Sequence, residues 1–83
     1  MSGFEWLEDL IKKEIPDAHI EVTDLTGTRD HLGILVASDI FKGKLLIDQH
    51  QILMNILKEE LKQRIHAVKL QTLTKEKFEQ TKG

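Results

Sequence analysis

Residues 65–73 form the stretch that most constrains how this chain can fold. Successive side chains of an extended segment point to opposite faces, so alternation of apolar and polar residues indicates a strand with one buried face. The two faces of this segment would be His66, Val68, Leu70 and Thr72 on one side, and Ala67, Lys69, Gln71 and Leu73 on the other. The segment therefore predicts a strand with a histidine at its entrance.

The length and composition predict one small globular domain. The chain has 83 residues, of which 40 % are hydrophobic and 31 % charged, which is too short for a two-domain enzyme with a closed cleft. It has no apolar run of about 18 residues, so no membrane span is expected. The first residues include Glu5 and no basic side chain, unlike a signal peptide, so we expect a cytoplasmic protein.

The absence of cysteine limits the chemistry that this chain can perform alone. It excludes thiol catalysis, disulfides and any thiolate metal site built from this chain only. Imidazole and carboxylate groups remain as metal ligands. The four histidines are His19, His31, His50 and His66.

The first fifteen residues predict an amphipathic helix. Ser2 and Glu5 have the spacing of a capping box, which places a helix start near Ser2. Pro16 disfavours helical geometry in the preceding residue, so the helix must end by Ile15. One face of the helix would be apolar and carries Phe4, Leu7, Leu10 and Ile11.

Two alternating segments follow and predict two strands, at residues 18–23 and 31–38. A polar loop at residues 24–30, rich in turn-forming residues, would join them. The alternation leaves His19 exposed on the first strand. His31 is expected at the rim of the sheet, where the loop becomes the second strand.

After the second strand, the spacing of apolar residues changes from every second residue, typical of a strand, to every third or fourth residue, typical of a helix. Residues 38–44 form a connection in which Phe41 is expected to act as an apolar plug, and a long helix begins at Leu45. Asn55 and the charged residues 58–60 allow a break into a second helical piece, and periodicity alone leaves that break open. The predicted core-facing stripe is Leu46, His50, Leu53, Met54, Leu57 and Leu61.

The last strand is followed by a short helical turn at residues 74–78, with Thr74 as its cap and Phe78 folded back onto the body. The element order is then αββααβ(α). A helical crossover before the last strand allows it to lie parallel to one of the first two. The expected fold class is α/β (α+β), with a three-stranded mixed sheet and the helices packed on one of its faces.

Four sequence motifs resemble the BolA family along nearly the whole chain. Residues 36–44 read VASDIFKGK, followed by His50, by I-H-A at residues 65–67, and by LTKEKF at residues 73–78. The family pattern is similar in order and spacing: V-S-x-x-F-x-G-K, then R-H-R-x-V, then I-H-A, then T-x-x-E-W. The resemblance implies a single BolA-like domain over residues 1–83 with a class II KH-like fold.

The resemblance also implies a function in iron–sulfur handling. BolA proteins are associated with monothiol glutaredoxins, with which they share a [2Fe-2S] cluster that also involves glutathione. Carried over to this chain, the I-H-A ligand is His66. The second family ligand comes from the loop between the first two strands, near Thr28, where the nearest imidazole is His31. The chain resembles the His-bearing, short-loop bacterial type, a monomer alone and a heterodimer with its partner.

The donor set of this chain fits a shared cluster and not one bound by the isolated chain. A [2Fe-2S] cluster needs four ligands, usually thiolates, and histidine replaces thiolate on one iron in Rieske centres. Without cysteine this chain can supply only a minority of the four. The remaining thiolates would come from the glutaredoxin and glutathione that the resemblance implies.

Each histidine also has a structural interpretation. His50 falls on the apolar stripe of the long helix, which favours a core histidine that is not a ligand. His66 shares a face with Val68, so a buried structural role stays open for it, as it does for His31. The ligand interpretation requires His31 and His66 to lie close enough to reach one metal centre.

Six basic side chains are candidates for binding a protein partner or an anion: Lys42, Lys44, Lys58, Lys62, Arg64 and Lys69. Charge is unevenly distributed, because residues 1–57 hold five Lys/Arg against ten Asp/Glu, whereas residues 58–83 hold seven against four. This asymmetry suits a protein partner better than a nucleic-acid backbone, which favours a broadly basic face.

DNA binding is the alternative function, since some members of the BolA family are described as transcriptional regulators. RNA-binding KH domains clamp the backbone with a G-x-x-G loop, and no two glycines here have that spacing. The family's R-H-R reads Gln49, His50 and Gln51 after Asp48, which works against phosphate binding. No nucleophile elbow, metal-binding helix motif or phosphate-binding glycine loop indicates an enzyme.

Overall fold

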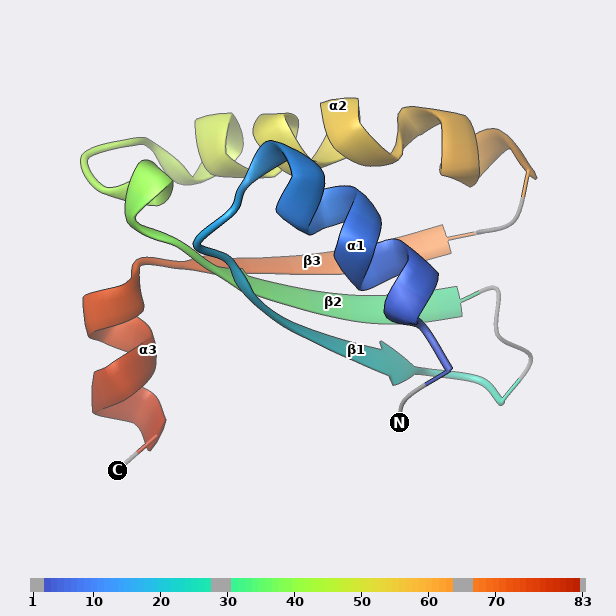
Figure 1. Cartoon of the computed structure of the whole chain (residues 1–83), viewed down its shortest axis with the longest axis horizontal. Coiled ribbons are helices and arrows are strands. Elements are labelled where there is room, and N and C mark those ends of the chain that lie inside the picture. The colour runs from blue at the N-terminus through green and yellow to red at the C-terminus, as the bar shows by residue number, and fades with distance from the viewer. Residues whose placement is uncertain (1–2, 28–30, 64–66, 83) are drawn as a thin grey trace.

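The computed structural model describes residues 3–27, 31–63 and 67–82. Figure 1 shows how the elements follow one another along the chain. They are α1 (Glu5–Glu14), β1 (His19–Asp24), β2 (His31–Ala37), the 3-10 helix η1 (Asp39–Phe41), α2 (Leu46–Gln63), β3 (Ala67–Leu73) and α3 (Lys75–Lys82).

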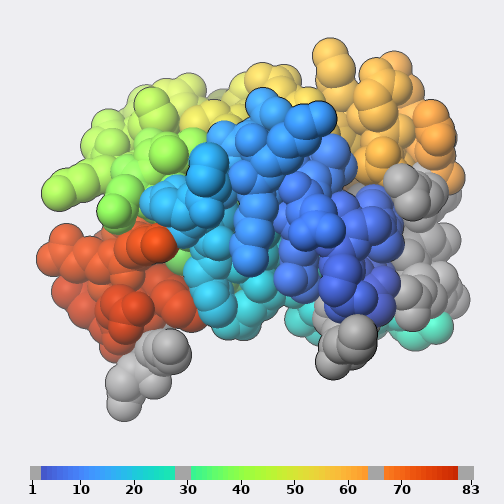
Figure 2. Space-filling model, viewed as in Figure 1, coloured from blue at the N-terminus to red at the C-terminus, as the bar shows by residue number. Residues whose placement is uncertain are grey.

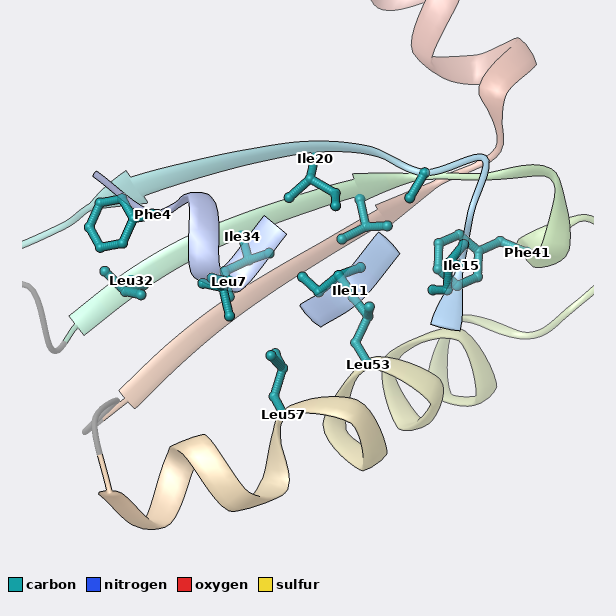
Figure 3. Packing of buried hydrophobic residues seen from close by; sticks show 12 residues of the cluster. Phe4, Leu7, Ile11, Ile15, Ile20, Leu32, Ile34, Phe41, Leu53 and Leu57 are labelled. Atoms are coloured by element: carbon teal, nitrogen blue, oxygen red, sulfur yellow. The ribbon is translucent and has the colours of Figure 1, made fainter. Parts of the chain in front are cut away.

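The three strands form one mixed sheet in the order β1, β2, β3. β1 and β2 are antiparallel, and β3 lies parallel to β2. The long α2 supplies the crossover between the parallel strands, and α1 and α2 pack on the same face of the sheet (Figures 1 and 3). The predicted mixed sheet with helices on one face is confirmed, and its other face is left open by these two helices.

The core lies between this sheet and the two helices (Figure 3). Every second residue of β2 points into it, with Leu32, Ile34 and Val36 all buried. Leu53 and Leu57 of α2 are also buried, as are Leu7 and Ile11 of α1, while the predicted Leu10 is half-buried against the core. Phe41 is fully buried and closes the end of the core where β2 leaves the sheet, as expected of the apolar plug.

The start of α1 differs from the capping-box prediction. The helix begins at Glu5, with Phe4 in the N-cap position and no side-chain cap. Glu5 instead accepts a hydrogen bond from the Gly3 N–H at 3.1 Å, while Ser2 lies outside the described residues. Phe4 occupies this position because its ring is buried in the core, and that burial outweighs a missing polar cap. The end of the helix before Pro16 is confirmed.

The break that periodicity left open, and that the order αββααβ(α) includes, does not occur, because α2 runs without interruption from Leu46 to Gln63. Two residues of the predicted stripe are also misplaced: Leu46 is 62 % exposed and Met54 is 38 % exposed. Ile52 and Ile56 pack against the core instead. They lie on the flank of α2 opposite Met54, since each residue turns the helix by about 100°.

β3 shows the predicted alternation, and the helix that follows it, α3, is longer than predicted. On β3, Val68, Leu70 and Thr72 are more buried than Ala67, Lys69 and Gln71. α3 continues to Lys82, beyond the expected turn at residues 74–78. Thr74 caps it, accepting a hydrogen bond from the Lys77 N–H at 3.2 Å. In Figure 2, α3 (red) forms a corner of the molecule next to the light green segment that leads into α2.

Candidate functional site

His31 is the first residue of β2 and belongs to the open face of the sheet. The next residue, Leu32, is buried against the helices, and alternation therefore turns the half-buried His31 the other way. Its carbonyl oxygen accepts a hydrogen bond from the Leu25 N–H at 2.8 Å. This bond draws the end of β1 and the start of β2 together at the rim of the sheet, as the sequence predicts.

The start of β3 lies directly beside His31. In the parallel register His31 pairs with Ala67 and Leu32 with Val68, and paired residues of neighbouring strands point to the same face. Ala67 is accordingly exposed and Val68 half-buried. Ala67 follows His66 in the sequence, but the predicted ligand His66 itself lies outside the described residues, as does Thr28.

The loop that leads toward His31 is ordered by its own side chains up to Gly27. The Asp24 carboxylate accepts hydrogen bonds from the backbone N–H groups of Thr26 at 3.3 Å and Gly27 at 2.9 Å. Gly27 has a φ of 80°, a conformation that glycine adopts without steric cost. Leu25 lies over Gly33, where an added Cβ would come within 3.3 Å of its side chain. Leu25 therefore covers the open face next to His31.

A hollow of about 300 Å³ continues from Gly33 along the open face. Its floor is the central strand, with Gly33 and Leu35, and its walls carry Glu21 on β1 and Lys69 on β3. The open face is thus mixed in character, with one carboxylate and one ammonium group on opposite sides of an apolar strip. His31 stands next to Gly33 on this face of β2.

The other two described histidines, His19 and His50, do not lie at the start of β2. His19 pairs with Ala37 at the other end of β2, about 20 Å from His31 at the rise of a strand. It is exposed as predicted, but its ring also packs on Phe78 with centroids 4.4 Å apart, and its Nε2 lies 3.0 Å from a Glu21 carboxylate oxygen. The sequence predicted that Phe78 folds back but gave no partner for it.

His50 does not join the buried core cluster. It is half-buried on α2, so the expectation of a core histidine is not met in full. Leu53, three residues later and fully buried, takes the central position instead. His50 lies in the first half of α2, where the neighbouring residues 42–48 are all exposed.

Among the described residues, no three His, Cys, Asp or Glu side chains lie close enough together to hold a metal ion. The edge of the sheet offers one described imidazole, that of His31. A metal centre at this edge would therefore need donors from elsewhere, and a cysteine-free chain leaves thiolates to another molecule.

The candidate basic residues fall into separate groups and do not form one patch. Lys58 and Lys62 are exposed, one turn apart, in the last part of α2. Lys42 and Lys44 lie before the start of α2, and about 18 Å of helix axis separates that start from Lys58. The others are Lys69, on the open face, and Arg64, outside the described residues.

In the part of the chain that the structure describes, none of the helices is both long and apolar enough to span a membrane.

The sheet order, the helices on one face and the histidine at the start of the central strand define a BolA-like α+β domain. The chain belongs to the BolA family: the family model described as BolA-like protein matches residues 11–77. The uncharacterized protein RP812 of Rickettsia prowazekii is 36 % identical over 70 residues, covering 84 % of this chain and 91 % of the relative. The solved structure of RP812 matches with a TM-score of 0.67 over the same shares of the two chains.

Two further relatives carry descriptive names. BolA-like protein 2 of Mus musculus is 34 % identical over 76 residues, covering 89 % of this chain and 87 % of the relative. The DNA-binding transcriptional regulator BolA of Escherichia coli is 27 % identical over 82 residues, covering 90 % and 78 %. These relatives are named as a regulator and as a BolA-like protein, and neither name is that of an enzyme.

Proposed function

We propose that this protein binds a monothiol glutaredoxin and shares a [2Fe-2S] cluster with it and with glutathione. His66 and His31 are the ligands from this chain, and the thiolates come from the glutaredoxin and glutathione. The observation that carries the proposal is the pairing of His31 with Ala67, the residue after His66, at the open rim of the sheet. Because Ala67 shares the face of His31, strict alternation would turn His66 to the face of Val68, so the ligand role requires the chain to depart from that alternation at His66. The complex is a heterodimer in the cytoplasm, and the protein alone is a monomer.

Imidazole ligands would give such a cluster distinct properties. Neutral imidazole in place of thiolate removes negative charge from the cluster, which raises its reduction potential, as in Rieske centres. Thiolate is the usual ligand of iron–sulfur clusters, so imidazole ligands are exchanged more readily. A role in cluster transfer or sensing fits this lability better than a permanent electron carrier.

The proposal is tested by assembling the cluster with the full chain, a monothiol glutaredoxin and glutathione under anaerobic conditions. The visible absorption and circular dichroism of the wild-type mixture should differ from those of the glutaredoxin alone. His66→Ala should abolish that difference, and His31→Ala should reduce it. His19→Ala and His50→Ala are matched controls that should leave the spectrum unchanged. An unchanged spectrum for His66→Ala would contradict the proposal.

DNA binding is the second candidate function, supported by the name of the Escherichia coli relative. It predicts a salt-dependent affinity for duplex DNA in the absence of any glutaredoxin. The sequence of α2 argues against it, since Asp48 and Gln49 stand in the region where the family pattern carries arginine. A DNA titration at two salt concentrations therefore separates the two functions, and tight binding that weakens with salt would favour the regulator.

A further inference from the structure

The most exposed apolar side chains of the described residues lie together at the start of α2. Leu45 is 71 % exposed, Leu46 62 % and Ile47 73 %. Single exposed apolar residues are common on protein surfaces, but a contiguous group indicates an interaction site. We name residues 45–47 the apolar tip. The tip lies at the end of α2 opposite the part of the helix that carries Lys58 and Lys62, so it is not part of the proposed metal-ligand edge.

The geometry of the apolar tip is convex. Its three residues are consecutive at a helix start, where successive side chains diverge by about 100°. Figure 2 shows the light green segment that leads into α2 at the outer edge of the molecule, beside α3. A rigid partner surface meets only one side of such a projection. A fluid interface can surround all three side chains at once.

Lysine side chains flank the apolar tip. Lys42 and Lys44, just before it, are both exposed. Lys44 also lines a hollow of about 250 Å³ together with Leu46, with Thr74 and, on α3, with Lys77. None of the described residues that line this hollow is acidic. Asp39 and Asp48 are exposed nearby, so the attraction for an anion resides in the lysine pair of the hollow and not in the overall charge of this end.

We propose that the apolar tip inserts into the interface of an anionic membrane, while the hollow between Lys44 and Lys77 receives a lipid phosphate. Apolar side chains that penetrate the headgroup region and lysines that contact anionic lipids combine in this way in peripheral proteins. The long lysine side chains can reach the headgroups while their stems lie against apolar groups. The protein lies on the surface and no part of it spans the bilayer.

A second copy of the chain fits the tip less well. Three side chains supply a few hundred Å² from each copy, whereas stable interfaces bury at least about 1,200 Å² in total. Two tips in contact would also bring Lys42 and Lys44 of one copy toward the same lysines of the other. An anionic lipid surface has the opposite charge and needs no matching shape.

The first test measures sedimentation of the full chain with vesicles. Vesicles of phosphatidylcholine and phosphatidylglycerol in a 7:3 ratio should retain the protein, and vesicles of pure phosphatidylcholine should retain at least several-fold less. The triple variant Leu45→Ser/Leu46→Ser/Ile47→Ser should lose binding to the anionic vesicles by ten-fold or more. Because these side chains are exposed, the variant should keep the wild-type circular dichroism. Met54→Ser, which removes another exposed apolar side chain of α2, should bind as the wild type does.

The second test addresses the lysines. Lys44→Glu/Lys77→Glu should weaken binding to the anionic vesicles several-fold, whereas Lys12→Glu/Lys13→Glu on the exposed side of α1 should change it less than two-fold. Inorganic phosphate at millimolar concentration should not release the protein, since the apolar tip holds it to lipid. Release by phosphate would overturn the lipid assignment.

The absence of cysteine allows insertion to be observed directly. Ile47→Cys labelled with an NBD fluorophore should shift its emission to the blue on the anionic vesicles, and Lys12→Cys with the same label should not. No shift at residue 47, or equal sedimentation of the triple variant, would overturn the proposal. Concentration-dependent dimers that disappear in the triple variant would assign the tip to a second copy and overturn it as well.

Discussion

The two ends of the sheet are held in different ways. Where β2 ends, side chains and backbone are fastened by a series of hydrogen bonds around Ser38, Gln49 and Thr72. Where β2 begins, the His31 carbonyl oxygen accepts a backbone bond from Leu25, and His31 pairs with Ala67 of β3. The end of β2 at Ser38 carries no candidate ligand, whereas the candidate ligand His31 lies at the start of the strand.

We call the end of β2 around Ser38, Gln49 and Thr72 the fastened end. Its hydrogen bonds connect elements that are distant in sequence. The Ser38 hydroxyl donates to an Asp17 carboxylate oxygen at 2.6 Å, and the Asp39 N–H donates to the other oxygen at 3.1 Å. The Thr72 hydroxyl donates to Gln49 Oε1 at 2.6 Å. We infer that this end supports the fold, while the start of β2 and β3 is available to a partner. Stability and cluster binding should therefore respond to different substitutions.

The largest loss of stability is expected from Phe41→Ala. Phe41 is fully buried at the fastened end, and truncation of a buried phenylalanine costs about 3–5 kcal/mol through lost burial and the cavity it leaves. Chemical denaturation with urea measures the change. A loss below about 1 kcal/mol would show that this end does not support the fold and would remove the contrast between the two ends.

Gln49→Ala should produce the next largest effect. The Gln49 side chain accepts from Thr72 and donates to the carbonyl oxygens of Phe41 at 3.2 Å and Lys44 at 2.9 Å. Its removal leaves the buried Thr72 hydroxyl without this acceptor, which costs about 1–3 kcal/mol. Gln51→Ala is a matched control on the same helix, because the Gln51 side chain donates to Asn55 Oδ1 at the exposed surface, at 3.0 Å. Equal losses for the two variants would contradict the role of Gln49.

Asp17 makes the stability of the fastened end depend on pH. Hydrogen bonds from Ser38 and from the Asp39 backbone, with the charge of Lys75, hold the pKa of this carboxyl below its usual value. The folded state therefore prefers ionised Asp17, so its contribution is complete above about pH 4 and is lost as pH falls through the lowered pKa. Asp17→Asn, which can accept only one of the two bonds, should cost about 1–2 kcal/mol at pH 7.

The difference between wild type and Asp17→Asn should shrink as the pH falls below about 4, where the unfolded carboxyl takes up its proton. Denaturation at pH 7, 5 and 3 checks this. Gln51→Ala, which changes no titratable group, serves as a control whose difference from wild type should show no such convergence. A constant difference at all three pH values would contradict the assignment to Asp17.

The fold was predictable from the sequence where burial follows a simple period. Alternation identified the buried faces of β2 and β3, and Pro16 fixed the end of α1. The errors arose where tertiary contacts outweigh local pattern. Phe4 takes the N-cap position because the core buries its ring, and Leu46 has the correct helical spacing but lies beyond the part of α2 that covers the core.

The candidate site was less predictable, for a related reason. The position of His31 follows from alternation within β2, but its neighbour depends on the register between β2 and β3, which the sequence of either strand alone does not specify. The contact between His19 and Phe78 likewise joins β1 to α3 across most of the chain. The sequence also suggested a common set of basic residues, which the length of α2 divides between the two ends of the molecule.

The smallest loss of stability is expected from His31→Ala, and it tests the contrast most directly. His31 is half-buried on the open face, outside the buried core, and a substitution there should change the free energy of unfolding by about 0.5 kcal/mol or less. The same variant should nevertheless reduce the glutaredoxin-dependent cluster signal, because the proposed ligand is gone. Urea denaturation and cluster spectra of one preparation measure both. A loss of stability comparable to that of Gln49→Ala, with an unchanged cluster signal, would show that His31 is a structural residue and that both ends of the sheet serve the fold.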